Sequence, residues 1–293
     1  MDNRKYEALL LVAEHGSITR ASEIMGYTQS GITQMINSLE KDLGIKLLTR
    51  TNKGAVLTNA GKRLLPYMRQ ENKWENHIRQ ECANMRGLET GSVTVGCLSS
   101  ISAAWMPDIL KHFAEKHPGI KVYMREAESE AIEELLLGAR IDVAITELKK
   151  KKAYEAKTLR QDEIFAILPH GHELANRETL TLKELTSYPF ISYSTGDAGA
   201  DDPGFPESVT NNRYRFNVMY SCKNDFTALE MVNSGLGISI CGELMLSNHN
   251  VDNVIVPLDP PLYRTLGIAT RAHETPLPAT QVFIRCVEEI TAL

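Results

Sequence analysis

Apolar residues recur at intervals of three and four through the first part of the chain, which is the spacing of one face of an α-helix. The pattern predicts three short helices separated by glycine-containing turns near residues 16, 26 and 44. Each helix has one apolar stripe that can pack against the other two. The stripes are expected at Tyr6, Leu9, Leu10 and Ala13, then at Ile18, Ala21 and Ile24, then at Ile32, Ile36, Leu39 and Leu43.

Short polar residues stand where the second and third helices should begin. Ser17 or Thr19 can cap the second helix, and the hydroxyl of Thr28 can cap the third. Gly26 makes the turn between them, and Gly44 can end the third helix because glycine adopts the left-handed conformation readily. The two helices and their turn have the spacing of a helix-turn-helix.

The face of the third helix opposite its apolar stripe carries amides and hydroxyls without charge. A solvated helix face is normally built from Lys, Glu and Arg, which are stronger helix formers. Amides and hydroxyls can instead donate to and accept from base edges in the major groove of DNA. The sequence therefore predicts a recognition helix, with DNA contacts from Thr28, Gln29, Ser30, Thr33, Gln34 and Asn37.

Residues 47–58 alternate around a turn at 52–54, which predicts a β-hairpin. Residues 28–63 hold six Lys or Arg against two Asp or Glu, so the hairpin would form a basic wing that suits a phosphate backbone. Arg50 and Lys53 are its expected phosphate contacts. The alternative is a three-helix packing domain whose polar face only meets water, because the bare motif also arises by chance.

A long helix should follow the wing, capped by Thr58 and bent locally at Pro66. Its apolar stripe has no partner within the small N-terminal domain, so a second copy of the same helix is the simplest partner and a dimer is expected. The alternative is that the stripe packs on the chain's own C-terminal part. The residues expected at the dimer interface are Leu64, Tyr67, Trp74, Ile78 and Met85.

From residue 92 the pattern alternates between short apolar strands and helices, which is typical of parallel sheets with helices on both faces. The strand-like segments are SVTVGC, IKVYMRE, IDVAITE, IFAILP, PFISYS, YRFNVMY, GISIC and LGIATR. Ligands in open α/β sheets lie beyond the carboxyl ends of strands and near helix N-termini.

The whole chain resembles the LysR-type transcriptional regulators of bacteria. The matching N-terminal segment is VAEHGSITRASEIMGYTQSGITQMINSLEKDLGIKLLTRTNKGAVLTNAGKRLL, and later landmarks follow in the family's order. These landmarks are ILKHFAEKHPGIKVYMREA, IDVAI, AILPHGHELA, MVNSGLGISI and TRAHETPLPATQVFIRCVEEI. The resemblance implies an α/β protein with an N-terminal all-α winged helix-turn-helix and a sensor part of two α/β lobes like those of periplasmic binding proteins.

The expected domains combine these patterns with the resemblance. They are a winged helix-turn-helix over residues 1–58, a linker helix for dimerisation over 59–90 and an effector-binding domain over 91–293. The resemblance divides the last domain into lobe 1 (91–161 and 268–293) and lobe 2 (162–267).

The resemblance also implies that a small-molecule effector binds between the lobes. Hydroxyl-rich strand ends and helix starts favour an organic anion there. The expected effector contacts are Ser99, Ser100, Ile101, Thr146, Glu147, Ser194, Thr195, Asn224 and Phe226. The acidic segment with Asp197, Asp201, Asp202 and Glu207 could instead select an amine or a metal, although a solvated loop is the simpler interpretation.

Charge and cysteine usage agree with a cytoplasmic two-part regulator. Residues 1–90 hold 13 Lys or Arg against 10 Asp or Glu, whereas the rest hold 19 against 27. The five cysteines are scattered without metal-site spacing, which indicates reduced thiols, and nothing near Cys222 or Cys241 suggests a redox switch. We expect no cofactor, no metal, and neither a signal peptide nor a membrane span.

The sequence contains none of the common catalytic motifs, neither a GxSxG elbow, a Walker loop nor HExxH, so we expect no enzyme. The expected function is sequence-specific transcription regulation controlled by the effector. Its partners would be double-stranded promoter DNA, a second or further copies of the chain in a homodimer or homotetramer, and RNA polymerase as a further candidate. The alternative is a solute-binding or enzymatic α/β domain fused to a helical interaction module.

Overall fold

The computed structural model describes residues 3–51, 54–85, 90–149, 153–193, 209, 214–223, 225–247 and 252–291. The chain divides into two compact units. The first comprises Met1–Leu88 with Gly138–Arg140, and the second comprises Glu89–Leu137 with Ile141–Leu293.

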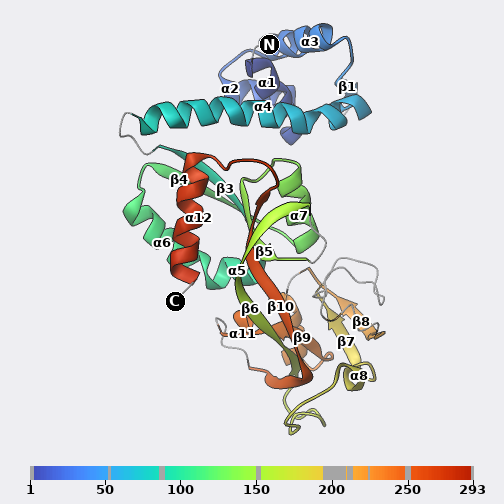
Figure 1. Ribbon diagram of the computed structural model, residues 1–293. Helices are drawn as coiled ribbons and strands as arrows, with labels where there is room; N and C mark the ends of the chain where they lie inside the picture. The colour runs from blue at the N-terminus through green and yellow to red at the C-terminus, as the bar shows by residue number, and fades with distance from the viewer. Residues whose placement is uncertain are drawn as a thin grey trace. The chain divides into compact units, whose positions relative to one another are not determined.

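The first unit consists of helices and one β-hairpin, called the wing below (Figure 1). In chain order the elements are α1 (Asn3–His15), α2 (Ile18–Met25), α3 (Gln29–Leu43), β1 (Leu48–Thr51), β2 (Gly54–Leu57) and α4 (Asn59–Asn84). The strands of the wing are antiparallel, with Leu48 opposite Leu57 and Arg50 opposite Ala55. α1 packs against α2, α3 and α4, so it is the centre of this unit.

Apolar side chains from all three short helices meet in one core. Leu9 and Val12 of α1 and Ile32 and Leu39 of α3 are fully buried. The prediction of the apolar stripe of α2 is wrong in part, because Ile24 is 46% exposed. The buried side of α2 instead runs through Ile18, Ala21, Ser22 and Met25, whose spacing of three and four fits one helix face.

The second unit alternates between strands and helices, as its apolar pattern predicts. In chain order the elements are β3 (Gly91–Cys97), α5 (Ser99–Ala104), α6 (Met106–Lys116), β4 (Ile120–Glu126), α7 (Ser129–Leu137), β5 (Val143–Glu147), β6 (Tyr154–Leu168), α8 (Leu182–Leu185), β7 (Pro189–Ser192), β8 (Asn217–Ser221), α10 (Asp225–Asn233), β9 (Ser239–Gly242), α11 (Glu243–Ser247), β10 (Val254–Arg271) and α12 (Pro278–Thr291).

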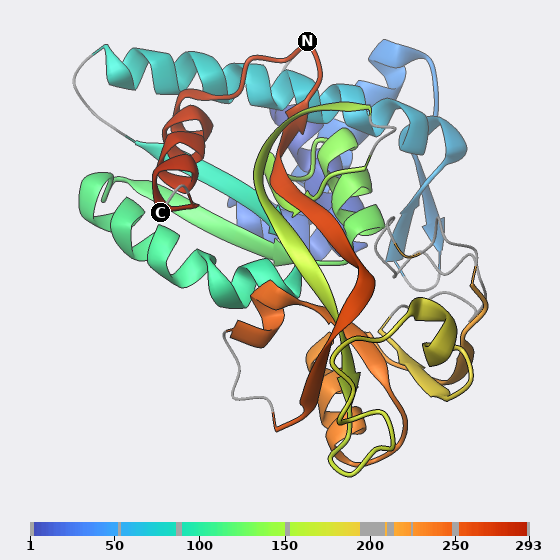
Figure 2. The same cartoon turned by 60° about the horizontal axis from the view of Figure 1, so that its bottom comes forward.

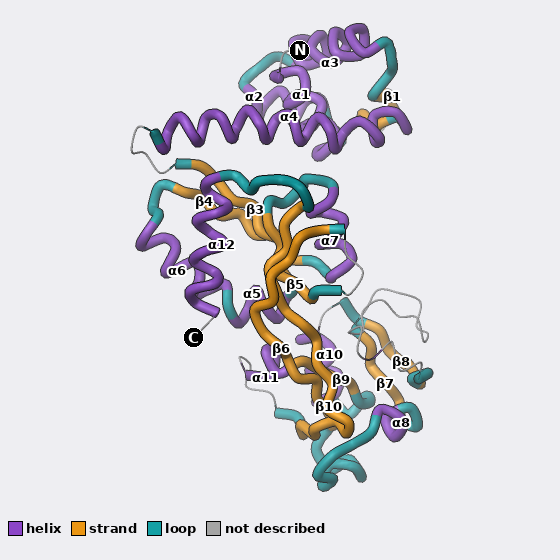
Figure 3. The backbone as a smooth tube through the Cα atoms, viewed as in Figure 1, coloured by secondary structure: helices purple, strands orange, loops and turns teal. Residues whose placement is uncertain are grey.

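The main sheet of this unit has the strand order β4-β3-β5-β10-β6-β9, and β7 pairs with β8 in a second sheet (Figure 3). The expectation of parallel sheets is correct only in part. β3 runs parallel to β4 and β5, and β7 runs parallel to β8. β10 is antiparallel to both β5 and β6, and β6 is antiparallel to β9.

Two long strands, β6 and β10, run side by side from one lobe into the other (Figures 1 and 2). At one end of β10, Leu266–Ala269 pair with β5. At the other end of the pair, residues 164–167 of β6 pair with β9. We call the part with β3, β4 and β5 the first lobe, and the part with β7, β8 and β9 the second lobe.

Helices cover both faces of the sheet in the first lobe. Val143 and Ile145 of β5 belong to a core that also contains Ile109 of α6 and Phe283 of α12. Ala144, between them in sequence, packs with α7 in a separate core. Successive strand residues point to opposite faces, so α6 and α12 cover one face and α7 covers the other.

Candidate functional site

Capping side chains and glycines set the helix-turn-helix of the first unit. The Ser17 hydroxyl accepts a hydrogen bond from the backbone N–H of Arg20 at 3.2 Å, and the Thr28 hydroxyl accepts one from Gly31 at 3.1 Å. Gly26 ends α2 at φ 71° and Gly44 ends α3 at φ 67°, both in the left-handed region. These contacts fix the length and the start of α3.

The uncharged polar face of α3 lies in an open groove. We call Gln29, Ser30, Thr33, Gln34 and Asn37 the recognition face. These five side chains line the groove together with the start of α2 and with β2 of the wing. The residues added by those two elements are Ser17, Ile18, Thr19, Gly54 and Ala55.

The structure thus brings five of the eight predicted DNA contacts onto one surface. The Thr28 hydroxyl caps α3, as its position before the first helical residue predicts, and it lies 3.0 Å from the Ser30 hydroxyl, but Thr28 does not line the groove. Arg50 lies in β1, but its side chain and the whole of Lys53 fall outside the described residues. Sequence reasoning missed the contribution of Ser17 and Thr19, because it treated both only as caps.

Hydrogen bonds attach the wing to the helices at several points. Ala55 donates its backbone N–H to the carbonyl of Gly16 at 3.1 Å, and Thr58 donates its backbone N–H to the carbonyl of Leu47 at 2.9 Å. Gly54 approaches Gly16 so closely that an added Cβ would lie 2.3 Å from its carbonyl oxygen. The wing is therefore held against the α1–α2 turn and the start of α4.

The long helix α4 exposes most of its predicted dimer stripe. Tyr67 is 74% exposed, Trp74 47%, Ile78 65% and Met85 84%. Leu64, by contrast, packs against the core of the first unit. Large apolar side chains exposed along one helix in this way are unusual for a surface that meets only water.

The predicted effector residues that the structure describes lie at strand ends and helix starts, but several of them are buried. Ser100 is 1% exposed and Thr146 is 4% exposed, and the side chain of Ile101 belongs to the core of the first lobe. Glu147 is half-buried at the end of β5. Phe226, near the start of α10, is 46% exposed.

One hydrogen bond brings two predicted elements of the two lobes together. The Ser99 hydroxyl at the start of α5 donates to the carboxylate of Asp225 at the start of α10 over 2.9 Å. Asp225 is 7% exposed. The other predicted contacts of the second lobe, Ser194, Thr195 and Asn224, lie outside the described residues.

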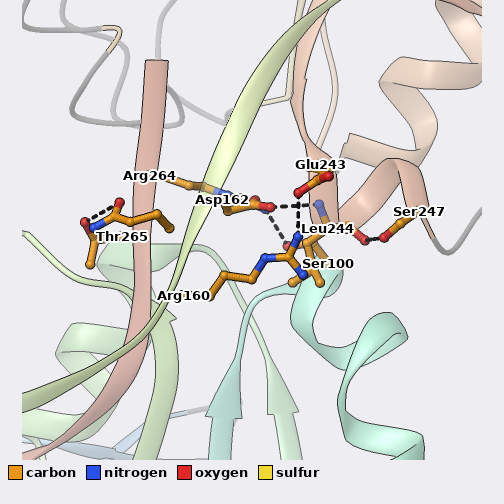
Figure 4. A network of polar contacts seen from close by, with 9 residues as sticks. Ser100, Arg160, Asp162, Glu243, Leu244, Ser247, Arg264 and Thr265 are labelled. Atoms are coloured by element: carbon orange, nitrogen blue, oxygen red, sulfur yellow. Dashed lines mark hydrogen bonds and ion pairs between the residues drawn. The ribbon is translucent and has the colours of Figure 1, made fainter. Parts of the chain in front are cut away.

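A buried ion pair joins the long strands between the lobes, where sequence reasoning expected nothing (Figure 4). Asp162 of β6 stands opposite Arg264 of β10, and Arg264 Nε lies 2.7 Å from Asp162 Oδ2. The second carboxylate oxygen accepts the backbone N–H of Leu244 at 2.8 Å, and Arg264 Nη2 donates to the Ser100 hydroxyl at 3.2 Å. We call these four residues the interlobe network.

Arg264 of the interlobe network stays charged despite its burial. Burial acts to lower the pKa of Arg264, but the adjacent Asp162 carboxylate outweighs it and raises that pKa above its usual range. An added Cβ at Gly242 would lie 2.3 Å from Asp162 Oδ2 and 2.7 Å from Arg264 Nη2, so a larger residue there would displace the ion pair. Arg160 and Glu243 form a second, more exposed ion pair beside the network.

The buried cysteines of the second unit are poorly suited to thiol chemistry. Burial raises the pKa of the Cys97 thiol to about 12, and it also raises the pKa of Cys241. Cys222 is half-buried, with its Sγ 3.5 Å from the carbonyl oxygen of Ser192. Neutral thiols react slowly, which supports the expectation that Cys241 is no redox switch.

Within the described ranges, no three His, Cys, Asp or Glu side chains cluster as metal ligands would. The ring of His172 packs edge-on against the ring of Tyr188, with ring centroids 4.8 Å apart, which is a structural contact. The described helices include none that is long and apolar enough to span a bilayer. The four carboxylates of the predicted acidic loop fall outside the described part of the chain.

Two family models match the chain, and together they cover nearly all of it. Residues 4–62 match "Bacterial regulatory helix-turn-helix protein, lysR family", and residues 86–292 match "LysR substrate binding domain". Among curated proteins, the uncharacterized HTH-type transcriptional regulator YvbU of Bacillus subtilis (strain 168) is 29% identical over 95% of both chains. Transcriptional activator protein LysR of Escherichia coli (strain K12) is 26% identical over 96% of this chain and 86% of its own.

Solved structures share the fold over the full length. A variant of full-length OxyR from Pseudomonas aeruginosa superposes with a TM-score of 0.80 at 18% identity, covering 100% of this chain and 95% of that one. Full-length CbnR in complex with its target DNA superposes with a TM-score of 0.65 at 19% identity, covering 99% of each chain. At such identities the likeness concerns the fold.

Proposed function

Because the chain belongs to the LysR family of bacterial transcriptional regulators, we propose that it reads promoter DNA through the recognition face of α3 and the wing. Members of this family are regulators and not enzymes, and this chain has both the DNA-binding and the effector-binding domain. The main support for this proposal is the groove that five uncharged polar side chains of α3 line together. Such side chains can form paired hydrogen bonds to base edges.

Selection from a random pool of duplex DNA tests this proposal. The purified protein should enrich one sequence family over successive rounds, and a double Gln34→Ala, Asn37→Ala variant should enrich it far less. Replacing Glu14, which lies exposed on α1, with Ala gives a control that keeps the recognition face. Recovery of random sequences by the unaltered protein would contradict the proposal.

We further propose that the chain works as a homodimer through α4, and that two dimers can associate into a tetramer. The exposed stripe of Tyr67, Trp74, Ile78 and Met85 supports this assembly, because pairing two copies would bury it. A dimer would also present two recognition helices to two half-sites of one promoter. RNA polymerase is a further candidate partner, and the cytoplasm, where chromosomal DNA lies in bacteria, is the proposed location.

Ile78→Glu is the sharpest test of the α4 interface. Burying an unpaired charge costs several kcal/mol, so this variant should run as a monomer in light scattering at micromolar concentration. Asn76→Glu is the matched control, because Asn76 is exposed and two residues away, on another side of the helix. An unaltered protein that is itself monomeric would contradict the dimer, and an Ile78→Glu dimer would contradict this interface.

For the effector, we propose a small organic anion bound between the two lobes. The Ser99–Asp225 hydrogen bond supports the location, because it brings the starts of α5 and α10 close together. The Ser99 hydroxyl, which donates to the Asp225 carboxylate, could donate to a bound anion in the same way. An anion bound there would have to displace the Asp225 carboxylate from Ser99. Ligand binding can shift the protein only by its different affinity for the two arrangements of the lobes.

A thermal-shift screen with small carboxylic acids and small amines tests both the site and the class. An acid should raise the melting temperature of the unaltered protein, and Ser99→Ala should reduce that shift while leaving DNA binding intact. Asp225→Asn, which removes the competing charge, should increase the affinity for the acid. Stabilisation by amines alone would contradict the anion and indicate that a carboxylate such as Asp225 selects the effector.

A further inference from the structure

A single buried carboxylate connects the recognition helix with the wing. Glu40, near the end of α3, is 5% exposed. Its Oε1 accepts the backbone N–H of Leu47 at 2.8 Å and that of Leu48 at 3.1 Å. Its other oxygen, Oε2, pairs with the ammonium group of Lys46. The carboxylate thus binds three donors at the start of β1.

Glu40 is placed one helical turn from the recognition face. It follows Asn37 by three residues, and residues three apart lie next to each other along a helix. Leu48, which donates to Glu40, begins β1, and two residues later Arg50 stands opposite Ala55 of β2. The anchor of the wing and the groove-lining residues therefore sit on adjoining turns of one rigid helix.

The other polar contacts of the wing lead to different parts of the unit. Ala55 is bonded to the α1–α2 turn, and the Thr58 hydroxyl at the start of α4 donates to the carbonyl of Lys46 at 2.7 Å. Those contacts fix β2 and the base of the hairpin. The contact of Glu40 fixes β1 directly to α3, which is the helix proposed to enter the major groove of DNA.

The contacts of Glu40 also make an acidic residue tolerable near DNA. Burial acts to raise the pKa of this carboxyl, but hydrogen bonds from Lys46, Leu47 and Leu48 outweigh it and lower the pKa below its ordinary value. The group is therefore ionised at neutral pH, with its charge facing a cation and two N–H groups. Asp42, the other acid of this stretch, is 42% exposed and pairs with Lys5 of α1 at 2.7 Å.

We propose that Glu40 is a positioning residue for DNA binding, which holds the wing at a fixed distance from the recognition face so that both engage one duplex. It touches no DNA itself, and it acts through the backbone N–H groups of Leu47 and Leu48. The inference rests on the proposed roles of the recognition face and the wing. It adds the side chain that holds these two elements in a fixed arrangement. Preorganised contacts bind more tightly, because less freedom is lost on association.

Measuring DNA affinity over a range of salt concentrations distinguishes a positioning role of Glu40 from a general effect on folding. The probe is the duplex that the unaltered protein enriches from a random pool. Glu40→Ala should bind it about tenfold or more weakly. The slope of log affinity against log salt should fall by about one for each wing that loses its phosphate contact. Glu40→Gln should restore most of the affinity and the slope, because an amide oxygen can still accept from Leu47 and Leu48.

Asp42→Ala is the matched control. It removes the same charge from the same end of α3, but the partner of Asp42 lies on α1 and not on the wing. Its salt slope should equal that of the unaltered protein. An equal loss of slope in Asp42→Ala and Glu40→Ala would overturn the inference, because the effect would then follow from charge alone. Unchanged affinity and slope in a folded Glu40→Ala variant would overturn it as well.

Amide exchange keeps the inference testable if Glu40→Ala does not fold. The N–H groups of Leu47 and Leu48 should exchange slowly in the unaltered protein, and somewhat faster in Glu40→Gln. Exchange at the rate of exposed loop amides in the unaltered protein would overturn the inference. If the unaltered protein enriches no DNA sequence, the proposed DNA-binding function is contradicted. If it does enrich one, but Glu40→Ala leaves affinity and salt slope unchanged, only the positioning role of Glu40 is contradicted.

Discussion

The two units of this chain use polar side chains in opposite ways. On α3 of the first unit, Gln29, Gln34 and Asn37 are exposed and carry no charge. In the second unit, Asp162 and Arg264 are charged, lie buried between the lobes and are bonded to each other. The first set leaves its hydrogen-bonding groups open to a groove, and the second set has its groups satisfied within the protein.

This contrast distinguishes side chains that recognise DNA from side chains that stabilise the fold. A polar group with no internal partner costs little at the surface and remains available to DNA. A buried charge is tolerated only when partners replace the water it has lost. Substitutions on the recognition face should therefore weaken DNA binding without weakening the fold, whereas substitutions in the interlobe network should weaken the fold first.

Asp162→Ala should have the largest effect on stability. It leaves the guanidinium of Arg264 buried without its counterion, and breaking one side of a buried pair costs about 3–5 kcal/mol. Urea unfolding of the second unit should show the loss. Glu243→Ala is the matched control, because Glu243 is 47% exposed and pairs with the 41% exposed Arg160. Such an exposed pair contributes about 0–1 kcal/mol. Equal losses in the two variants would remove the contrast between buried and exposed charges.

Ser100→Val should have a smaller effect of the same kind. It removes the acceptor of Arg264 Nη2, and an unsatisfied buried donor costs about 1–3 kcal/mol. The free energy of unfolding of the second unit should fall by that amount, with DNA affinity unchanged in the absence of effector. An unchanged free energy of unfolding in Ser100→Val would show that this hydroxyl does not stabilise the buried ion pair.

Lys53→Ala should have the smallest effect and should leave stability unchanged. Loss of one phosphate contact should weaken binding to all duplexes alike and lower the salt slope by about one. Fluorescence anisotropy over a range of salt concentrations measures both quantities. A Lys53→Ala variant that loses preference between sequences, with an unchanged slope, would place the wing at base edges instead of at the phosphates.

Much of the first unit could be predicted because local chemistry determines it. Ser17, Thr28, Gly26 and Gly44 mark helix starts and ends through their own backbone contacts. The role of Glu40 could not be predicted, because a glutamate followed by Lys41 and Asp42 resembles an ordinary solvated helix residue. Its partners come from residues 46–48, and their approach depends on the tertiary fold.

The long strands of the second unit were harder to predict for a related reason. Asp162 and Arg264 interrupt the apolar pattern of β6 and β10, so the pattern marks only the apolar segments 164–169 and 266–271 as strands. Their pairing across the sheet compensates for the interruption, but it joins residues 102 positions apart. The antiparallel direction of β10 follows from that same long-range pairing and leaves no local signal.

Gln34→Ala, measured for both binding and stability, tests the central claim most directly. Gln34 is exposed in the groove of the recognition face, so its loss should weaken binding to the selected duplex by about 1–3 kcal/mol. Affinity for random duplex DNA and the free energy of unfolding should remain those of the unaltered protein. Equal weakening on selected and random DNA, or a loss of stability without a loss of sequence preference, would contradict the account.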